Sequence, residues 1–282
     1  MYTRNILVVG GGTMGSGIAQ VAAVSGFQVT LTDVSASQLE RAQALIAQSV
    51  AKLEAKGVLN RDQCYAAQNI RYRLSLDEIV EADLVIEAVY EDIDVKLGLF
   101  SQFDQIAPQE AILGSNTSSI SITKLAAVTS RPAQVIGMHF MNPVPLMRLV
   151  EVVAGMDTSQ KTVDEIMEVC QAMGKEPVLV NDSPGFISNR LICPMINEAI
   201  YALQENVGSA QAIDAVMKLG MNHPMGPLAL ADLIGLDVVL AVMEILHRDL
   251  GEDKYRPAYL LRKMVAAGRL GRKSGRGFYI YN

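Results

Sequence analysis

Residues 5–17 read NILVVGGGTMGSG, and this stretch decides the fold of the first part of the chain. The apolar run at 6–9 predicts a strand over 5–9, and the pattern at 14–24 predicts a helix. The glycines between them are Gly10, Gly12 and Gly15. Glycine costs a strand or helix interior about 0.5–1 kcal/mol relative to alanine, so the cluster needs a reason. The spacing G-x-G-x-x-G supplies one. The first glycine allows a tight turn, the second lets a pyrophosphate approach the backbone, and the third lets helix and strand pack closely.

The start of this helix and the end of the next strand predict further cofactor contacts. Thr13 and Met14 fill the two x positions before the last glycine, where the helix N-terminus offers free N–H groups to phosphates. The second expected strand, 28–32, ends at Asp33, about where an acid accepts the ribose hydroxyls. This carboxylate would repel a 2′-phosphate, so we expect NAD and not NADP. A plain glycine turn and a solvated strand-end acid are the alternatives.

The rest of the chain divides into an alternating part and a helical part. Further strands are expected at 83–88, 111–114, 134–140, 149–153 and 177–180, with helices between most of them, for example 35–56 and 95–106. Such alternation predicts βαβ units and a Rossmann-type, mostly parallel sheet. The turn cluster NDSPG at 181–185 divides the chain into domains 1–183 and 184–282. The second is expected to be all-helical, with helices at 187–204, 209–219, 228–250 and 258–267.

Composition argues against several classes of protein. The net charge of −6 is unfavourable for a nucleic-acid binder. The three cysteines are far apart and odd in number, which predicts no disulfide framework, no metal site and a reducing compartment. The apolar stretch at 228–246 carries Asp232, Asp237 and Glu244, so we do not expect a membrane span. A strand begins almost at the N-terminus, so we expect no signal peptide and a cytoplasmic location.

Five further stretches go beyond the glycine motif. They are NTSS at 116–119, GMHFMNPVPLMRLVEVV from Gly137, NDSPGFISNR at 181–190, NHPMGPLALADLIGLD from Asn222, and GRKSGRGFYIY at 271–281. Together, over nearly the whole chain, they resemble the short-chain L-3-hydroxyacyl-CoA dehydrogenases, and most closely the bacterial 3-hydroxybutyryl-CoA dehydrogenases. The resemblance implies reversible oxidation of an (S)-3-hydroxyacyl-CoA to the 3-ketoacyl-CoA with NAD. It also implies a homodimer formed through the helical C-terminal domain.

The same resemblance assigns roles to individual residues. It makes His139 the catalytic base and Glu151 its partner, and it makes Ser118 and Asn189 polar contacts of the substrate near the reacting oxygen. The implied cofactor contacts are Glu91, Lys96, Asn116, Asn142 and Lys273. The implied coenzyme A contacts include Ser49 and Lys56. The chain departs from the family pattern in the stretch YED at 90–92, where an asparagine often follows the glutamate.

The chemistry of an alcohol oxidation also favours His139. The reaction needs a base, and histidine has the side chain whose unperturbed pKa lies nearest neutrality. His139 closes a predicted strand at the sheet edge where open α/β folds bind ligands. In contrast, His223 precedes a proline in a turn and His247 lies among charged residues of a helix. A structural strand-end histidine is the alternative. Glu151 lies in the apolar run RLVEVV and needs a partner unless its strand position faces water.

Other positions have simpler alternatives. Ser118 and Asn189 could be helix caps, and Lys96 and Lys273 are ordinary surface lysines without the resemblance. In the helix 35–56, an apolar face is formed by Leu39, Ala42, Ile46, Val50 and Leu53. Ser49, Lys52 and Lys56 line an adjacent face and suit a phosphate-bearing nucleotide, although a solvated lysine face has the same pattern.

Two other functions fit parts of the sequence. One is a dehydrogenase of a free 3-hydroxyacid, which would not need the lysine face. The other is an NAD-binding protein without catalytic activity. Mixing the protein with NADH and acetoacetyl-CoA distinguishes both from the acyl-CoA dehydrogenase.

Overall fold

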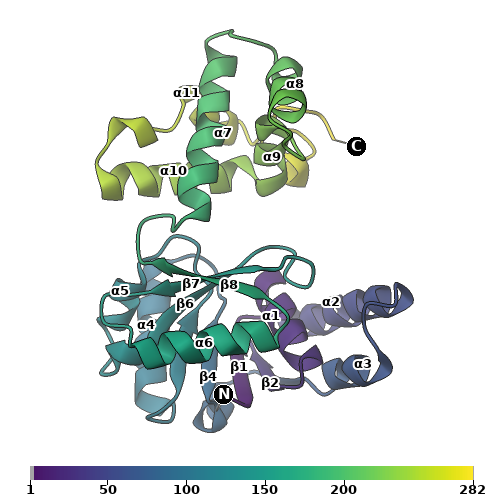
Figure 1. Cartoon of the computed structure of the whole chain (residues 1–282), viewed down its shortest axis with the longest axis vertical. Coiled ribbons are helices and arrows are strands. Elements are labelled where there is room, and N and C mark those ends of the chain that lie inside the picture. Colours follow the sequence, from purple (N-terminus) through teal and green to yellow (C-terminus); the bar gives the residue numbers. More distant parts are fainter. Residues whose placement is uncertain (1–2, 282) are drawn as a thin grey trace. The chain divides into compact units, whose positions relative to one another are not determined.

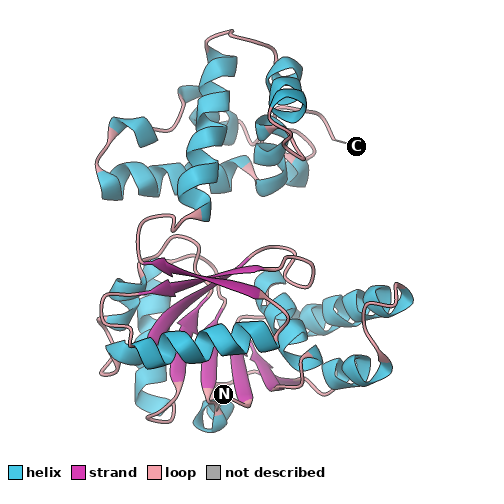
Figure 2. Cartoon of the chain, viewed as in Figure 1, coloured by secondary structure: helices cyan, strands magenta, loops and turns pink. Residues whose placement is uncertain are grey.

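The computed structural model describes residues 3–281 and divides the chain into two compact units, Met1–Ser183 and Pro184–Asn282. The first unit is a sheet flanked by helices, and the second is built of helices (Figure 1, Figure 2). Each unit has its own hydrophobic core.

The sheet of the first unit confirms the expected α/β fold. Its eight strands lie in the order β3-β2-β1-β4-β5-β6-β7-β8. Their bounds are β1 Asn5–Val9, β2 Gln28–Thr32, β3 Arg71–Arg73, β4 Leu84–Glu87, β5 Ile112–Ser115, β6 Val135–Phe140, β7 Leu149–Ala154 and β8 Glu176–Asn181. The strands from β3 to β6 pair in parallel, β7 pairs with β6 antiparallel, and β8 pairs with β7 in parallel. The sheet is therefore mostly parallel, as predicted.

Helices cover both faces of this sheet. They are α1 Thr13–Val24, α2 Ala36–Ala55, α3 Arg61–Gln68, α4 Ile93–Ile106, α5 Ile122–Ala126 and α6 Gln160–Ala172. Side chains of α1, α2, α3 and α6 join alternate residues of the strands in one core, which includes Ile18, Ile46, Ile86 and Ile166. On the opposite side of the sheet from α6 lie α4 and α5 (Figure 1), with Phe100 and Phe103 of α4 fully buried. The apolar runs of the strands follow from this double covering.

Two elements of the first unit were not expected. The strand β3 reads RYR, has only three residues and lies at the edge of the sheet, so no apolar run marks it. The helix α3 is short and polar. Its start is nevertheless encoded, because Asn60 accepts a hydrogen bond from the Gln63 N–H while the Gln63 side chain accepts one from the Asn60 N–H.

The second unit corrects one expected helix. Its helices are α7 Ser188–Gln204, α8 Ala210–Gly220, α9 Pro227–Ile234, α10 Leu236–Leu250 and α11 Tyr259–Ala266. The expected single helix 228–250 is thus two helices, because Gly235 has φ +106 and interrupts the helical backbone. The core of this unit is formed mainly by α7, α9, α10 and α11, for example by Ile196, Leu236 and Leu261.

Candidate functional site

The glycine turn lies between β1 and α1. A Cβ on Gly10, whose φ is +109, would lie 2.6 Å from the Ala88 carbonyl oxygen, and one on Gly15 would lie 1.8 Å from the Gly10 carbonyl oxygen. These two glycines are therefore required by packing. At Gly12, the N-cap of α1, a Cβ would meet nothing within 4 Å. The backbone at the helix N-terminus is thus open to a phosphate group, which fits a pyrophosphate there.

Asp33 follows β2 and is held by backbone groups. One carboxylate oxygen accepts the Gly11 N–H at 2.8 Å and the other accepts the Ser35 N–H at 2.9 Å. Because a carboxylate offers about four lone-pair sites, acceptor capacity remains for ribose hydroxyls. Two residues of the expected nucleotide site, Gly12 and Asp33, therefore follow the carboxyl ends of the neighbouring strands β1 and β2.

A buried lysine lies between two carboxylates beside this turn. Lys96 of α4 is only 1% exposed, and its ammonium lies 2.9 Å from Glu87 and 3.0 Å from Glu91. Glu87 ends β4, is fully buried and also accepts hydrogen bonds from Ser115 Oγ and the Val89 N–H. Lys96 is therefore not the surface lysine that an isolated helix pattern suggests. The buried ammonium of Lys96 is instead paired with the carboxylates of Glu87 and Glu91, as a buried lysine requires.

Glu91 in turn holds the NTSS segment after β5. Its Oε1 accepts the Ser118 N–H at 3.0 Å, the Ser119 N–H at 3.1 Å and the hydroxyl groups of Thr117, Ser118 and Ser119. Burial raises the pKa of Glu91, but the Lys96 ammonium and these hydrogen bonds outweigh it, so the pKa lies below its usual range. Glu91 is an ionised anchor for the loop that carries Ser118.

The remaining cofactor-side residues of the first unit lie at the same sheet edge. Asn116 follows β5, and its side-chain oxygen accepts the Phe140 N–H at 3.0 Å, which ties it to the end of β6. Asn142 follows β6 and is exposed. Asp92, at the position where the family pattern often has asparagine, is the N-cap of α4 and accepts the Val95 N–H. An asparagine oxygen can make the same cap.

His139 and Glu151 form a buried pair. They are direct partners in the antiparallel β6–β7 register, and His139 Nδ1 lies 2.8 Å from Glu151 Oε2. The residues are 7% and 2% exposed. Side chains of directly opposed residues project to the same face of a sheet, so the twelve-residue separation is a consequence of strand pairing. Glu151 thus has a partner and does not face water. The other histidines differ: His247 of α10 is half-exposed beside Asp253, and His223 lies in the connection between α8 and α9.

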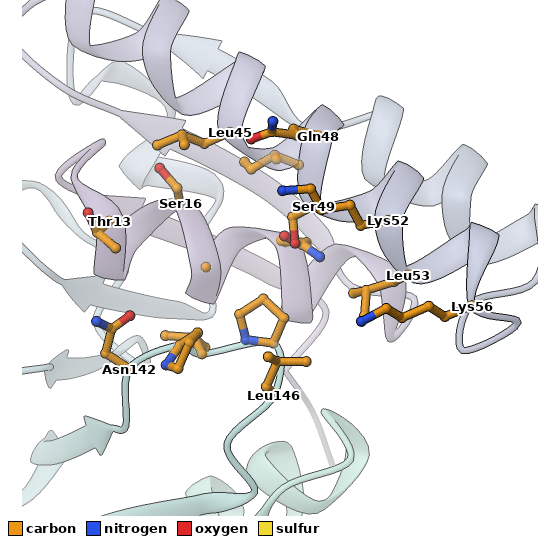
Figure 3. A pocket seen from close by; sticks show the side chains of 16 residues that line it. Thr13, Ser16, Leu45, Gln48, Ser49, Lys52, Leu53, Lys56, Asn142 and Leu146 are labelled. Atoms are coloured by element: carbon orange, nitrogen blue, oxygen red, sulfur yellow. The ribbon is translucent and has the colours of Figure 1, made fainter. Parts of the chain in front are cut away.

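A cavity of about 310 Å³ opens between α1, α2 and the segment after β6, and we call it the α1–α2 cavity. Figure 3 shows Ser49, Lys52 and Lys56 of the α2 side facing the segment that carries Asn142 and Leu146. The five residues expected on the packed face of α2 are all buried, as predicted. The two lysines are exposed, and neither forms an ion pair with a carboxylate among residues 3–281. The cavity therefore combines an apolar floor with two uncompensated cations.

The second unit holds the other two expected site residues. Asn189 lies in the first turn of α7, whose N-cap is Ile187. Ser118, in the first unit, precedes α5, whose N-cap is Ser121. Neither Asn189 nor Ser118 is therefore a helix cap. The ammonium of Lys273 lies 2.6 Å from Asp237. Its segment is anchored by buried Asp232, which accepts the N–H groups of Phe278 and Tyr279.

Comparison with known proteins decides the family. The model for "3-hydroxyacyl-CoA dehydrogenase, NAD binding domain" matches residues 5–183, and that for "3-hydroxyacyl-CoA dehydrogenase, C-terminal domain" matches residues 185–281. The chain belongs to the 3-hydroxyacyl-CoA dehydrogenase family. It is therefore an oxidoreductase with NAD as its cofactor, as expected from the glycine turn and Asp33.

Individual members of this family match over their full length. The chain is 55% identical over 97% of its length to a probable 3-hydroxybutyryl-CoA dehydrogenase of Deinococcus radiodurans, and 53% identical over its whole length to one of Bacillus subtilis. It covers 99% and 98% of those proteins. The crystal structure of (S)-3-hydroxybutyryl-CoA dehydrogenase from Ralstonia eutropha superposes with a TM-score of 0.96 at 50% identity, covering 99% of both chains.

Sequence reasoning missed one group near the site. Glu87 stands at the end of an apolar strand, as Glu151 does, and the same argument about a buried carboxylate would have found it. Between residues 3 and 281, no set of three or more His, Cys, Asp and Glu side chains could hold a metal ion. None of the helices in the same range combines the length and the apolar character that a transmembrane helix needs.

Proposed function

We propose that this protein interconverts (S)-3-hydroxybutyryl-CoA and acetoacetyl-CoA, with His139 as the general acid and base. The observation that carries the proposal is the buried pair, in which His139 Nδ1 lies 2.8 Å from Glu151 Oε2. The four-carbon acyl group is supported by the names of the relatives from Deinococcus radiodurans and Bacillus subtilis.

The pair supplies a histidine in one defined tautomer. The Glu151 carboxylate accepts the proton on Nδ1, so in this tautomer the ring nitrogen that carries the lone pair, and can act as the base, is Nε2. In the oxidation, Nε2 takes the hydroxyl proton as the C3–O bond becomes a carbonyl, and Glu151 stabilises the imidazolium that forms. In the reduction, the imidazolium returns that proton to the carbonyl oxygen. NAD held at the glycine turn and Asp33 would supply the hydride acceptor for C3 in the oxidation, and NADH would supply the hydride donor in the reduction.

Two polar residues complete the site in the proposal. Ser118 and Asn189 donate hydrogen bonds to the substrate oxygen, where negative charge develops. The carboxylate of Glu91 supports this role for Ser118, because it fixes the Ser118 N–H at 3.0 Å. It accepts the Ser118 hydroxyl only at 3.4 Å, a long bond that the substrate oxygen can replace. For Asn189 the support is the family resemblance, together with its position in the first turn of α7 and not at the N-cap.

The proposed cofactor contacts follow from the glycine turn, from Asp33 and from the family resemblance. The residues concerned are Gly10, Gly12, Thr13, Met14, Gly15, Asp33, Glu91, Asn116, Asn142 and Lys273. Lys96 acts in this scheme by holding Glu91 between its ammonium and the NTSS segment, since it is itself 1% exposed.

Coenzyme A is proposed to lie along the α1–α2 cavity. The Ser49 hydroxyl and the ammonium groups of Lys52 and Lys56 would contact its phosphate-bearing nucleotide. The absence of ion pairs at these lysines within residues 3–281 supports this assignment, because their charge is available to a ligand.

In this scheme, residues 1–183 form the NAD-binding domain and residues 184–282 form the domain of substrate contact and dimerisation. An apolar groove of about 490 Å³ between α7 and α8 supports the homodimer, since Val207 and Val216 beside it are exposed. A cytoplasmic location is supported by three buried free thiols. Burial raises the pKa of the Cys170 thiol to about 12.

The test follows the absorbance of NADH with acetoacetyl-CoA, longer 3-ketoacyl-CoA thioesters and free acetoacetate. We expect the highest kcat/KM with acetoacetyl-CoA. A higher kcat/KM with a longer thioester would overturn the chain-length assignment, and one with free acetoacetate would overturn the coenzyme A assignment. Binding of NADH without turnover of any of these compounds would favour the non-catalytic alternative.

A further inference from the structure

Lys175 is a buried lysine outside the site described above. It lies in the turn between α6 and β8 and is 7% exposed. Its ammonium donates hydrogen bonds to the backbone carbonyls of Val144 and Met147, the latter at 2.8 Å. No carboxylate among residues 3–281 lies within ion-pair distance of it. Burial lowers the pKa of Lys175 below its usual range. Burying an ammonium group without a carboxylate partner costs free energy of folding. The two carbonyls that it binds therefore indicate why a lysine is present here.

These carbonyls belong to the segment 141–148, which follows β6. Within it the Pro143 carbonyl accepts the N–H groups of Leu146 and Met147, both at 3.0 Å. On its other side the segment packs against α1. Val144 is buried, and a Cβ on Gly17 would lie only 2.8 Å from the Val144 Cβ. The segment is thus held between Gly17 and the ammonium of Lys175.

The same segment forms one wall of the α1–α2 cavity. Pro143, Val144, Pro145 and Leu146 line it. Figure 3 shows Leu146 of this wall across the cavity from the α2 residues. The hydrogen bond to the Val144 carbonyl is buried, and the bond to the Met147 carbonyl is partly buried. A buried carbonyl without a donor is costly, so loss of the ammonium would favour a shift of Val144 and Met147 toward water. The wall of the cavity would move with them.

We propose that Lys175 is a positioning residue, which shapes the acyl-CoA cavity by fixing the carbonyls of Val144 and Met147. The inference rests on the proposed function, because it takes the α1–α2 cavity as the acyl-CoA site. Lys175 touches neither the substrate nor the cofactor in this scheme. Its effect should fall on substrate binding, which the wall provides in the ground state and the transition state alike.

The variant Lys175→Met keeps the aliphatic stem and removes the donor. We expect its KM for acetoacetyl-CoA to rise about 10- to 150-fold, the loss typical of a hydrogen bond to a charged group. Its kcat should stay within about twofold of wild type. Hydrogen exchange of the Leu146 and Met147 amides in the ligand-free protein should become faster. This second readout does not depend on activity.

Arg131→Met is the matched control. Arg131 is equally buried and donates to the carbonyls of Asp104 and Pro108, away from the cavity. We expect a lower Tm and an unchanged KM for acetoacetyl-CoA. Gly17→Ala tests the same wall of the cavity if Lys175→Met fails to fold. Its new methyl group would displace Val144 while Lys175 keeps its hydrogen bonds. It should also raise KM.

The proposal is overturned if Lys175→Met leaves KM and amide exchange at wild-type values, or if Arg131→Met raises KM as much. A wild-type protein that does not turn over acetoacetyl-CoA would contradict the proposed function instead. The exchange experiment would then still decide whether Lys175 holds the segment 141–148.

Discussion

Replacing Glu151 by glutamine tests the proposed catalytic pair most directly. Glutamine keeps the size of the side chain and an oxygen that can accept the Nδ1 proton of His139, but it removes the negative charge. The two side chains are 2.8 Å apart and nearly excluded from water. A hydrogen bond to a charged group contributes about 1.5–3 kcal/mol. Since about 1.36 kcal/mol in the barrier is tenfold in rate, kcat should fall about 10- to 150-fold.

The assay measures kcat and KM with acetoacetyl-CoA and NADH, together with the Tm of each variant. The KM for NADH should change little, because the proposed role of the Glu151 charge is to stabilise the imidazolium of His139 and not to bind the cofactor. Glu110→Gln is the control, since Glu110 is an exposed partner of Lys161 and such pairs contribute about 0–1 kcal/mol. It should leave kcat unchanged.

A double-mutant cycle completes the test. His139→Gln alone should lower kcat about 10²- to 10⁴-fold, the range for loss of a general base. Adding Glu151→Gln should then cost almost nothing more, because the two residues act as one unit. Wild-type kcat in Glu151→Gln, or two losses that multiply in the double variant, would refute the reasoning.

Three more perturbations test other parts of the structure. Asp33→Asn should narrow the preference for NADH over NADPH, measured as the ratio of initial rates at equal subsaturating concentrations, because the carboxylate that repels a 2′-phosphate is gone. An unchanged ratio would contradict this role. Lys56→Ala should raise the KM for acetoacetyl-CoA several-fold at low salt and less at high salt, while acetoacetyl-pantetheine kinetics stay the same; equal losses with both would mean that Lys56 supports the fold. For Asp104, burial raises the pKa, but hydrogen bonds from Ser130 and Arg131 outweigh it and hold the pKa below its ordinary value of 3.8. Its stabilising effect is therefore present above pH 3.8 and lost as pH falls through the lowered pKa. Below pH 3.8, the Tm of Asp104→Asn should therefore fall less steeply with decreasing pH than the Tm of wild type. An equally steep fall in wild type and variant would contradict this role of Asp104.

Most of the fold could be read from local sequence pattern. The strands β1 and β2 have the expected bounds, because each is an apolar run next to a turn of glycine or aspartate. The strand β3 could not be found in this way, since the pairing of RYR with β2 is a tertiary contact without an apolar signal. The break at Gly235 depends on a positive φ between two apolar helices, and an apolar pattern alone does not encode it.

The candidate site was predictable where one strand end or one helix face defines it. The glycine turn, Asp33 and the α2 face are of this kind. The burial of Lys96 was not, because it depends on Glu87, which lies on a strand beneath the helix and is brought there only by folding. The role of Lys175 under the segment 141–148 likewise joins residues that are about 30 positions apart.

The pairing of β6 with β7 has a consequence for how such a protein can diversify. His139 and Glu151 are aligned by the ladder of the two strands, and the eight residues between those strands do not set this alignment. A slip of one residue would turn Glu151 to the opposite face of the sheet, whereas an insertion in the connecting segment leaves the ladder as it is. The segment 141–148, which forms one wall of the α1–α2 cavity, can thus vary in length and composition while His139 and Glu151, the proposed proton-transfer pair, stay aligned.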